Sequence, residues 1–383
     1  MSKTIFNKWT LILILTAATL NAAEAQETSF KFSGLVDVGA KITSNSNSAL
    51  NKSEIINNNS GTSALFLDAA RNIGAETKAS IHFELDINPA SSSSLSGANN
   101  NTQAYSGTPF QGEQYVSLTG RFGDVKLGTP NSAAFVASQV SEPLSTQLGS
   151  GYSVVFGRLG TAAISGMNQV DGNGAGRILR HEKSIIYTSP AYNGLKGSVE
   201  YAFGNDNSAT VTSDSNTNTA ISVQYSQGSL NAIYVFNNEK AGSNGASGPA
   251  ATFGTTPIVS LPVNTDISWN MASANYNFGT YTLYAGLTTT KHNAPVPLED
   301  SSSWNVAGKY ALNPDIDLMA NYLVRSTKLA NTSNATLIGL GMNYYLDKQT
   351  NLYGRYENQS FDANGTAKST SQSIWAFGIR YLF

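Results

Sequence analysis

The chain contains no cysteine among its 383 residues, which excludes disulfide bridges and thiolate metal sites. Charged residues make up only 13% of it and the formal net charge is −2, so it lacks the basic surface of nucleic-acid-binding proteins. After residue 25 no apolar run reaches the roughly 18 residues that a transmembrane helix needs. These absences leave a polar chain stabilised by backbone hydrogen bonds and packing.

The first 25 residues have the pattern of a secretory leader. Lys3 and Lys8 precede the apolar run Leu11–Leu20, and Ala23-Glu24-Ala25 fits a small-x-small cleavage site. We therefore expect residues 1–25 to be a signal peptide and the mature chain to begin at Gln26. The leader carries two lysines and one glutamate, so its removal leaves a net charge of about −3.

Side chains alternate sharply at the end of the chain. Every second residue from Trp375 to Phe383 is large and apolar, whereas the intervening positions are mostly small or charged, as at Arg380. Because a strand has a side-chain period of two, one face is apolar and aromatic. In a transmembrane barrel that face meets lipid, with aromatic residues near the interfaces. In a soluble β-protein it would meet a core, and this alternative remains open here.

Similar alternating segments recur along the chain, separated by short turns and long polar loops in turn. We count sixteen strands, so residues 26–383 are expected to form one all-β domain, a 16-stranded antiparallel transmembrane β-barrel. Sixteen strands leave room for a water-filled lumen. One stretch, about 129–180, has no clean period of two; within it, Ser132–Ala137 is compatible with a short helix.

Five segments carry a resemblance to a known family. They are FKFSGLVDVG at 30–39, GRFGDVKLG at 120–128, SIIYTSPAYNG at 184–194, EYAFG at 200–204 and GIRYLF at 378–383. In this order the chain resembles the Gram-negative general porins of the β-proteobacterial and neisserial type. The resemblance implies a homotrimer of barrels in the cell outer membrane, with the third external loop folded inward. It also implies a passive water-filled channel for small hydrophilic solutes and ions, in which residues 129–180 are the constriction loop.

Inward-facing charged residues are the candidate pore-lining and constriction residues, because rings or opposed clusters of charge tune which ions pass. The candidates near mid-strand or in the insert are Asp37, Glu84, Glu142, Arg177, Arg180, Lys309 and Arg355. The strand alternation also places Arg380 and Tyr353 at inward-facing positions. The near balance of positive and negative charges predicts weak charge selectivity.

Other functions are compatible with parts of the pattern. His82, His181 and His292 have no metal-ligand spacing, and a Ser-His hydrolase would require one of them at a membrane interface. We expect no catalytic, cofactor or metal site, and the expected partners are outer-membrane lipid and small solutes rather than nucleic acid. The remaining alternatives are a substrate-specific porin and a surface adhesin without channel activity.

Overall fold

The computed structural model describes residues 28–74, 76–90, 98–99, 103–104, 112–156, 179–203, 217–240, 266–293, 300–327, 333–363 and 369–383. The expected signal peptide and Arg177 lie outside these residues. Within them, no helix is both long and apolar enough to cross a membrane.

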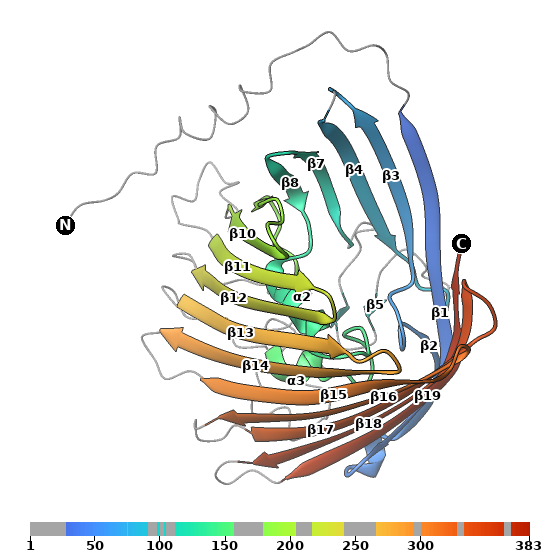
Figure 1. The fold of residues 1–383 in the computed structure, drawn as a ribbon. Helices are drawn as coiled ribbons and strands as arrows, with labels where there is room; N and C mark the ends of the chain where they lie inside the picture. Colours follow the sequence, from blue (N-terminus) through green and yellow to red (C-terminus); the bar gives the residue numbers. More distant parts are fainter. Residues whose placement is uncertain are drawn as a thin grey trace, which may run out of the picture.

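An antiparallel sheet closes on itself to form a barrel (Figure 1). The closure is made by β1 (Ser29–Asn45), which pairs with β19 (Thr370–Leu382) along one edge and with β2 (Lys52–Asn57) and β3 (Ala64–Asn72) along the other. The sheet has seventeen strands in the described part of the chain. Because β2 and β3 share one position beside β1, the wall has sixteen positions, and the expected 16-stranded barrel is confirmed.

Each remaining wall strand pairs with its neighbours in sequence order. They are β4 (Lys78–Asp86), β7 (Gln114–Gly120), β8 (Gly123–Thr129), β9 (Ser184–Thr188), β10 (Leu195–Ala202), β11 (Thr217–Gln227), β12 (Leu230–Lys240), β13 (Asp266–Asn277), β14 (Tyr281–Asn293), β15 (Ser301–Asn313), β16 (Ile316–Thr327), β17 (Ser333–Tyr345) and β18 (Thr350–Ala363). Two further elements are not part of the barrel sheet. They are η1 (Ser48–Leu50) and the small hairpin of β5 (Ala98–Asn99) and β6 (Gln103–Ala104).

The wall alternates between an apolar outer face and a largely polar inner face. On β19, Trp375 and Phe377 are 47% and 53% exposed, whereas Ile374 and Ala376 between them are buried. Inward-facing Asp37 on β1 is fully buried, although its side chain is polar. Exposed apolar side chains and buried polar ones reverse the usual pattern of a water-soluble protein, and they match a barrel solvated by lipid. The predicted alternation is confirmed.

Two helices lie inside the barrel, on the concave side of the sheet (Figure 1). They are α2 (Ala133–Val140) and α3 (Tyr152–Phe156), both in the insert between β8 and β9. Alanines of α2 pack on an apolar patch of β12 and β13 that includes Val235 and Trp269. Val154 of α3 packs on a second inward apolar patch that includes Leu337. Burial of these two patches holds the insert against the inner wall.

The strand register predicts where a charge disrupts the barrel. Tyr322 lies on the outer face of β16 and is 40% exposed, so Tyr322→Arg places a charge against the acyl chains. We expect folding in a bilayer or micelle to be destabilised by roughly 2–4 kcal/mol, measured by reversible denaturant unfolding. Ser326→Arg, on the same face near the strand end, is the matched control with an expected cost of about 0–1 kcal/mol. Equal costs for the two variants would contradict this register.

Candidate functional site

The second wall strand is interrupted by a short inward segment. β2 ends at Asn57 and β3 begins at Ala64, and both pair with the same edge of β1, so residues 58–63 leave the wall between them. Asn58 has a positive φ of 62°, a conformation that asparagine tolerates better than most residues. Its side chain accepts a hydrogen bond from Ser63 N at 2.7 Å, which closes the turn.

Asp37 on β1 holds this 58–63 segment in place. Its Oδ2 accepts hydrogen bonds from the backbone N–H groups of Ser60 and Gly61, at 2.6 and 2.8 Å. Its Oδ1 accepts a hydrogen bond from the Tyr353 hydroxyl at 2.5 Å. Hydrogen bonds to an ionised acceptor are stronger than neutral ones, so three donors on one buried carboxylate make a firm anchor.

Tyr353 reaches Asp37 because two glycines lie opposite each other in the wall. Gly39 of β1 and Gly378 of β19 are register partners, and the Tyr353 hydroxyl occupies the space that a Cβ at either position would need. The Asn59 side chain donates a further, longer hydrogen bond to this hydroxyl at 3.4 Å. The glycine pair therefore accommodates the tyrosine that anchors the segment.

Two arginines border the 58–63 segment and differ in their partners. Arg355 donates to Ser60 Oγ at 2.6 Å and also to Asn343 Oδ1 and two backbone carbonyls, so its guanidinium is fixed. Arg380 lies directly opposite Asp37 in the β1–β19 ladder and packs on Gly61, where a Cβ would be 3.0 Å from its Nε. Arg380 is partly exposed and makes no hydrogen bond or ion pair with the described residues.

Wall side chains on the opposite side hold the main chain of the insert. Asn305 donates to Ser141 O at 2.7 Å, and Asn321 donates to Ser150 O at 2.8 Å. Glu357 accepts from Gly149 N at 2.7 Å. These contacts, together with the two apolar patches, place residues 133–156 along the lumen wall from β12 to β18.

The insert also contacts the 58–63 segment. Gln147 Nε2 donates to Thr62 Oγ1 at 3.4 Å, so two inward segments from distant parts of the chain meet inside the barrel. Glu142 stabilises the turn of the insert before Gln147: its carboxylate accepts hydrogen bonds from the backbone N–H groups of Leu144 and Thr146. Burial raises the pKa of Glu142 to about 7, although these N–H groups and Arg355 favour the charged form.

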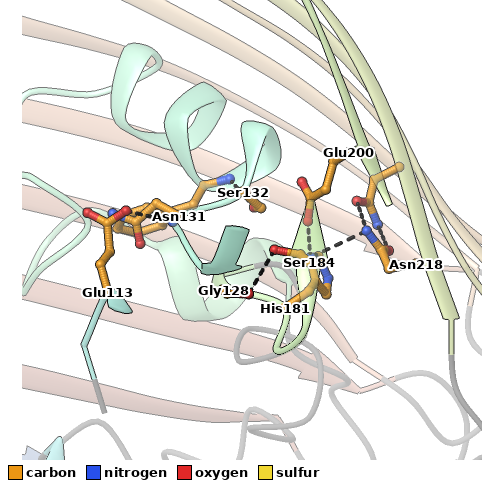
Figure 2. Close-up of polar contacts among 10 residues, drawn as sticks. Glu113, Gly128, Asn131, Ser132, His181, Ser184, Glu200 and Asn218 are labelled. Atoms are coloured by element: carbon orange, nitrogen blue, oxygen red, sulfur yellow. Dashed lines mark hydrogen bonds and ion pairs between the residues drawn. The ribbon is translucent and has the colours of Figure 1, made fainter. Parts of the chain in front are cut away.

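Figure 2 shows the neck where the insert leaves and rejoins the wall. Ser132 N donates to Leu179 O at 3.0 Å, and Asn131 forms a β-bridge with Arg180. Glu113 accepts a hydrogen bond from Asn131 N at 2.7 Å. Ser132 also caps α2, since its Oγ accepts from Phe135 N at 3.0 Å.

The return side of the neck is fixed by a second polar cluster (Figure 2). His181 Nδ1 lies 2.5 Å from Glu200 Oε1 and 3.3 Å from Asn218 Nδ2, and Asn218 and Asn237 exchange two amide–amide hydrogen bonds. Both ends of the insert are therefore bound to the inner wall.

The predicted site residues fall into separate groups. Asp37 and Arg355 meet at the 58–63 segment, whereas Glu84 lies 4.0 Å from Arg180 at the neck. Lys309 lies near the end of β15 and pairs with Asp317 at 3.7 Å, away from both groups. The sequence did not single out the 58–63 segment. Glu357 and Arg380 were only two of many inward-facing charged residues, and no local signal distinguished them.

The described structure and the sequence both match known proteins. A profile of the Gram-negative porins matches residues 10–364. The chain belongs to the Gram-negative porin family. It is thus an outer-membrane channel protein for small solutes, and the family and location expected from the sequence are confirmed. No curated protein matches the chain in a sequence comparison.

Solved porins share the fold at low sequence identity. An anion-selective porin from Comamonas acidovorans has a TM-score of 0.72 at 22% identity, covering 93% of this chain and 100% of that chain. OmpT of Vibrio cholerae in its trimer form has a TM-score of 0.64 at 14% identity, with 93% and 99% covered. OmpF of Salmonella typhi, in complex with daunomycin, has a TM-score of 0.60 at 14% identity, with 92% and 97% covered.

Proposed function

We propose that this porin is a passive diffusion channel whose narrowest part lies where the insert meets the 58–63 segment. The hydrogen bond from Gln147 to Thr62 carries this proposal, because it joins two inward segments within one lumen. Residues 129–180 then act as the constriction loop. Residues 1–25 act as the signal peptide that directs export. Small hydrophilic solutes and ions pass, and larger ones are excluded by size.

The overall balance of charges predicts weak selectivity, but the charges at this constriction favour anions. The carboxylates of Asp37, Glu142 and Glu357 each accept backbone N–H groups of an inward segment, so amide dipoles offset part of their negative potential. Arg380 faces Asp37 across the β1–β19 ladder without a hydrogen bond or ion pair among the described residues, and its side chain is partly exposed. A cation exposed beside a narrow passage attracts anions and repels cations. The structurally similar Comamonas porin is described as anion-selective, which agrees with this proposal.

The proposed assembly is a homotrimer in outer-membrane lipid. The trimer form of V. cholerae OmpT, which shares the fold, supports this stoichiometry. The apolar, aromatic outer face supplies the surface that lipid and neighbouring subunits cover. We also propose that the protein has no enzymatic activity, because the polar side chains at the constriction are engaged in holding main-chain segments.

Planar-bilayer recording tests the channel proposal. Purified protein should produce stepwise conductance increases, often in groups of three, and a reversal potential in a KCl gradient that indicates anion preference. A membrane that stays silent at high protein concentration would count against a channel. Saturable block by one solute would instead indicate a substrate-specific porin.

A further inference from the structure

Three metal-ligating side chains meet on the inner wall beside the neck of the insert. They are His82 and Glu84 of β4 and Glu113, which directly precedes β7. One ligand atom from each lies within 4.8 Å of the other two. Their sequence spacing matches no metal motif; strand pairing brings them together, because Glu84 N donates to Glu113 O across the β4–β7 ladder at 2.8 Å.

We propose that this His82–Glu84–Glu113 cluster binds a divalent transition-metal cation such as Zn²⁺. Imidazole nitrogen combined with carboxylate oxygen suits Zn²⁺ and its neighbours, whereas Ca²⁺ and Mg²⁺ prefer sites made of oxygen alone. Zn²⁺ binds nitrogen and oxygen ligands at about 2.0–2.2 Å, so the three side chains would draw together around a bound ion.

The orientation of His82 fits a metal ligand. Its Nδ1 lies 2.7 Å from Asp68 Oδ1 on β3. An ionised carboxylate only accepts hydrogen bonds, so Nδ1 donates to Asp68, and in the neutral ring Nε2 is the nitrogen that can bind a cation. A carboxylate behind the imidazole is the arrangement that orients metal-bound histidines and makes them more basic. Stacking of the ring between Phe66 and Tyr115 holds this orientation.

Asp86 adds a further buried carboxyl group beside the cluster. Its carboxyl lies within hydrogen-bonding reach of Glu84, and its Oδ1 is buried with no hydrogen-bond partner. Asp86 is only 5% exposed. Two carboxyl groups buried this close together cannot both carry a charge at low cost, so either a proton or a cation must lie between them.

The local charge balance supports the same conclusion. The groups that face the cluster are Asp68 from β3, Asp86 from β4, Arg180 from the neck and Lys126 from β8, which lies over the Tyr115 ring. Arg180 approaches Glu84 only to 4.0 Å, which is longer than a hydrogen bond. Four carboxyl groups therefore face two cationic side chains, Arg180 and Lys126, and like charges opposite each other destabilise a sheet.

A bound ion would act on the neck of the insert. Glu113 accepts the hydrogen bond from Asn131 N, the residue at which the insert leaves the wall (Figure 2). A cation bound by Glu113 together with His82 and Glu84 of β4 would hold the Glu113 carboxylate in place. It would also add positive charge near the start of the insert. This inference does not depend on the ion preference of the channel.

Titration calorimetry of the folded protein in detergent tests the site, with Zn²⁺ as the probe. We expect one Zn²⁺ per protomer, at least tenfold weaker binding in Asp68→Asn, and no binding in His82→Ala. His181→Ala and His292→Ala are the matched controls and should bind as the unmodified protein does. Cobalt substitution should give a d–d absorption band that also disappears in His82→Ala.

Three results would overturn the proposal. They are the absence of Zn²⁺ binding, binding that survives in His82→Ala, and equal loss of binding in His292→Ala. Ca²⁺ that binds as tightly as Zn²⁺ would also contradict it, because it would show that the imidazole is not a ligand. Conductance recordings are independent of these measurements, so a failed metal site leaves the diffusion channel standing.

Discussion

Replacing Arg380 with glutamate is expected to change the K⁺/Cl⁻ permeability ratio about tenfold in favour of K⁺. A unit charge about 4 Å from an ion contributes roughly 1 kcal/mol in water and about 4 kcal/mol near a protein surface. A free-energy difference of 1.4 kcal/mol corresponds to a factor of ten, so reversing one partly exposed charge at the constriction is sufficient for a tenfold change in the permeability ratio. The measurement is the reversal potential of single channels in a KCl gradient.

Salt and position provide the controls for this prediction. The shift should shrink as the total salt approaches 1 M, where the Debye length falls from about 10 Å to about 3 Å. Arg380→Gln should give roughly half the free-energy change. Lys309→Glu should give a smaller shift, because Lys309 is paired with Asp317 near the strand end. A reversal potential that does not respond to Arg380→Glu would remove this residue from the ion path.

The wall of this porin was predictable from local sequence, because successive side chains of a strand point alternately to its two faces. Phe377 and Trp375 point outward and Tyr353 points inward, as their alternation predicts. The short helix within the insert was also predictable, since Ser132 is a typical N-cap residue before an alanine-rich stretch. These features depend on neighbours close in sequence.

The interior was not predictable in the same way. Residues 57–59 look like an ordinary polar loop, and only the pairing of both β2 and β3 with β1 shows that the 58–63 segment interrupts a wall strand. Asp37 meets Tyr353 across the barrel closure, a separation of 316 positions. Parity identifies a charge that faces the lumen, but it does not show whether that charge meets an ion or holds a main-chain segment.

The carboxylates illustrate this ambiguity. Glu84, Glu142 and Asp37 were predicted as pore-lining residues from their parity or from their place in the insert. In the structure each accepts at least one backbone N–H group. Whether they also tune ion flow stays a prediction, as it does for Arg177, which lies outside the described residues. Mutation can separate the two roles, because an anchor changes the size of the pore and a free charge changes its selectivity.

Replacing Asp37 with alanine is expected to widen the channel. The change removes the acceptor of the Ser60 and Gly61 N–H groups, and charge-assisted hydrogen bonds of this kind contribute about 1.5–3 kcal/mol each. Without them the 58–63 segment loses its anchor and Arg380 loses the carboxylate that faces it. We therefore expect a larger single-channel conductance and passage of larger neutral sugars in liposome swelling assays.

Two matched variants distinguish loss of the anchor from loss of a charge. Tyr353→Phe removes one donor to Asp37 but keeps the charge and both backbone hydrogen bonds, so its conductance should rise less than that of Asp37→Ala. Asp317→Ala removes a lumen-facing carboxylate that accepts from Tyr345, pairs with Lys309 and holds no inward segment among the described residues, and it should leave the size limit unchanged. Equal widening by Asp317→Ala, or an unchanged size limit in folded Asp37→Ala protein, would show that the 58–63 segment does not narrow the pore.

Because the segment lies inside a barrel closed by β1 and β19, its release should leave the wall intact, and gel mobility before and after heating checks that the barrel still folds.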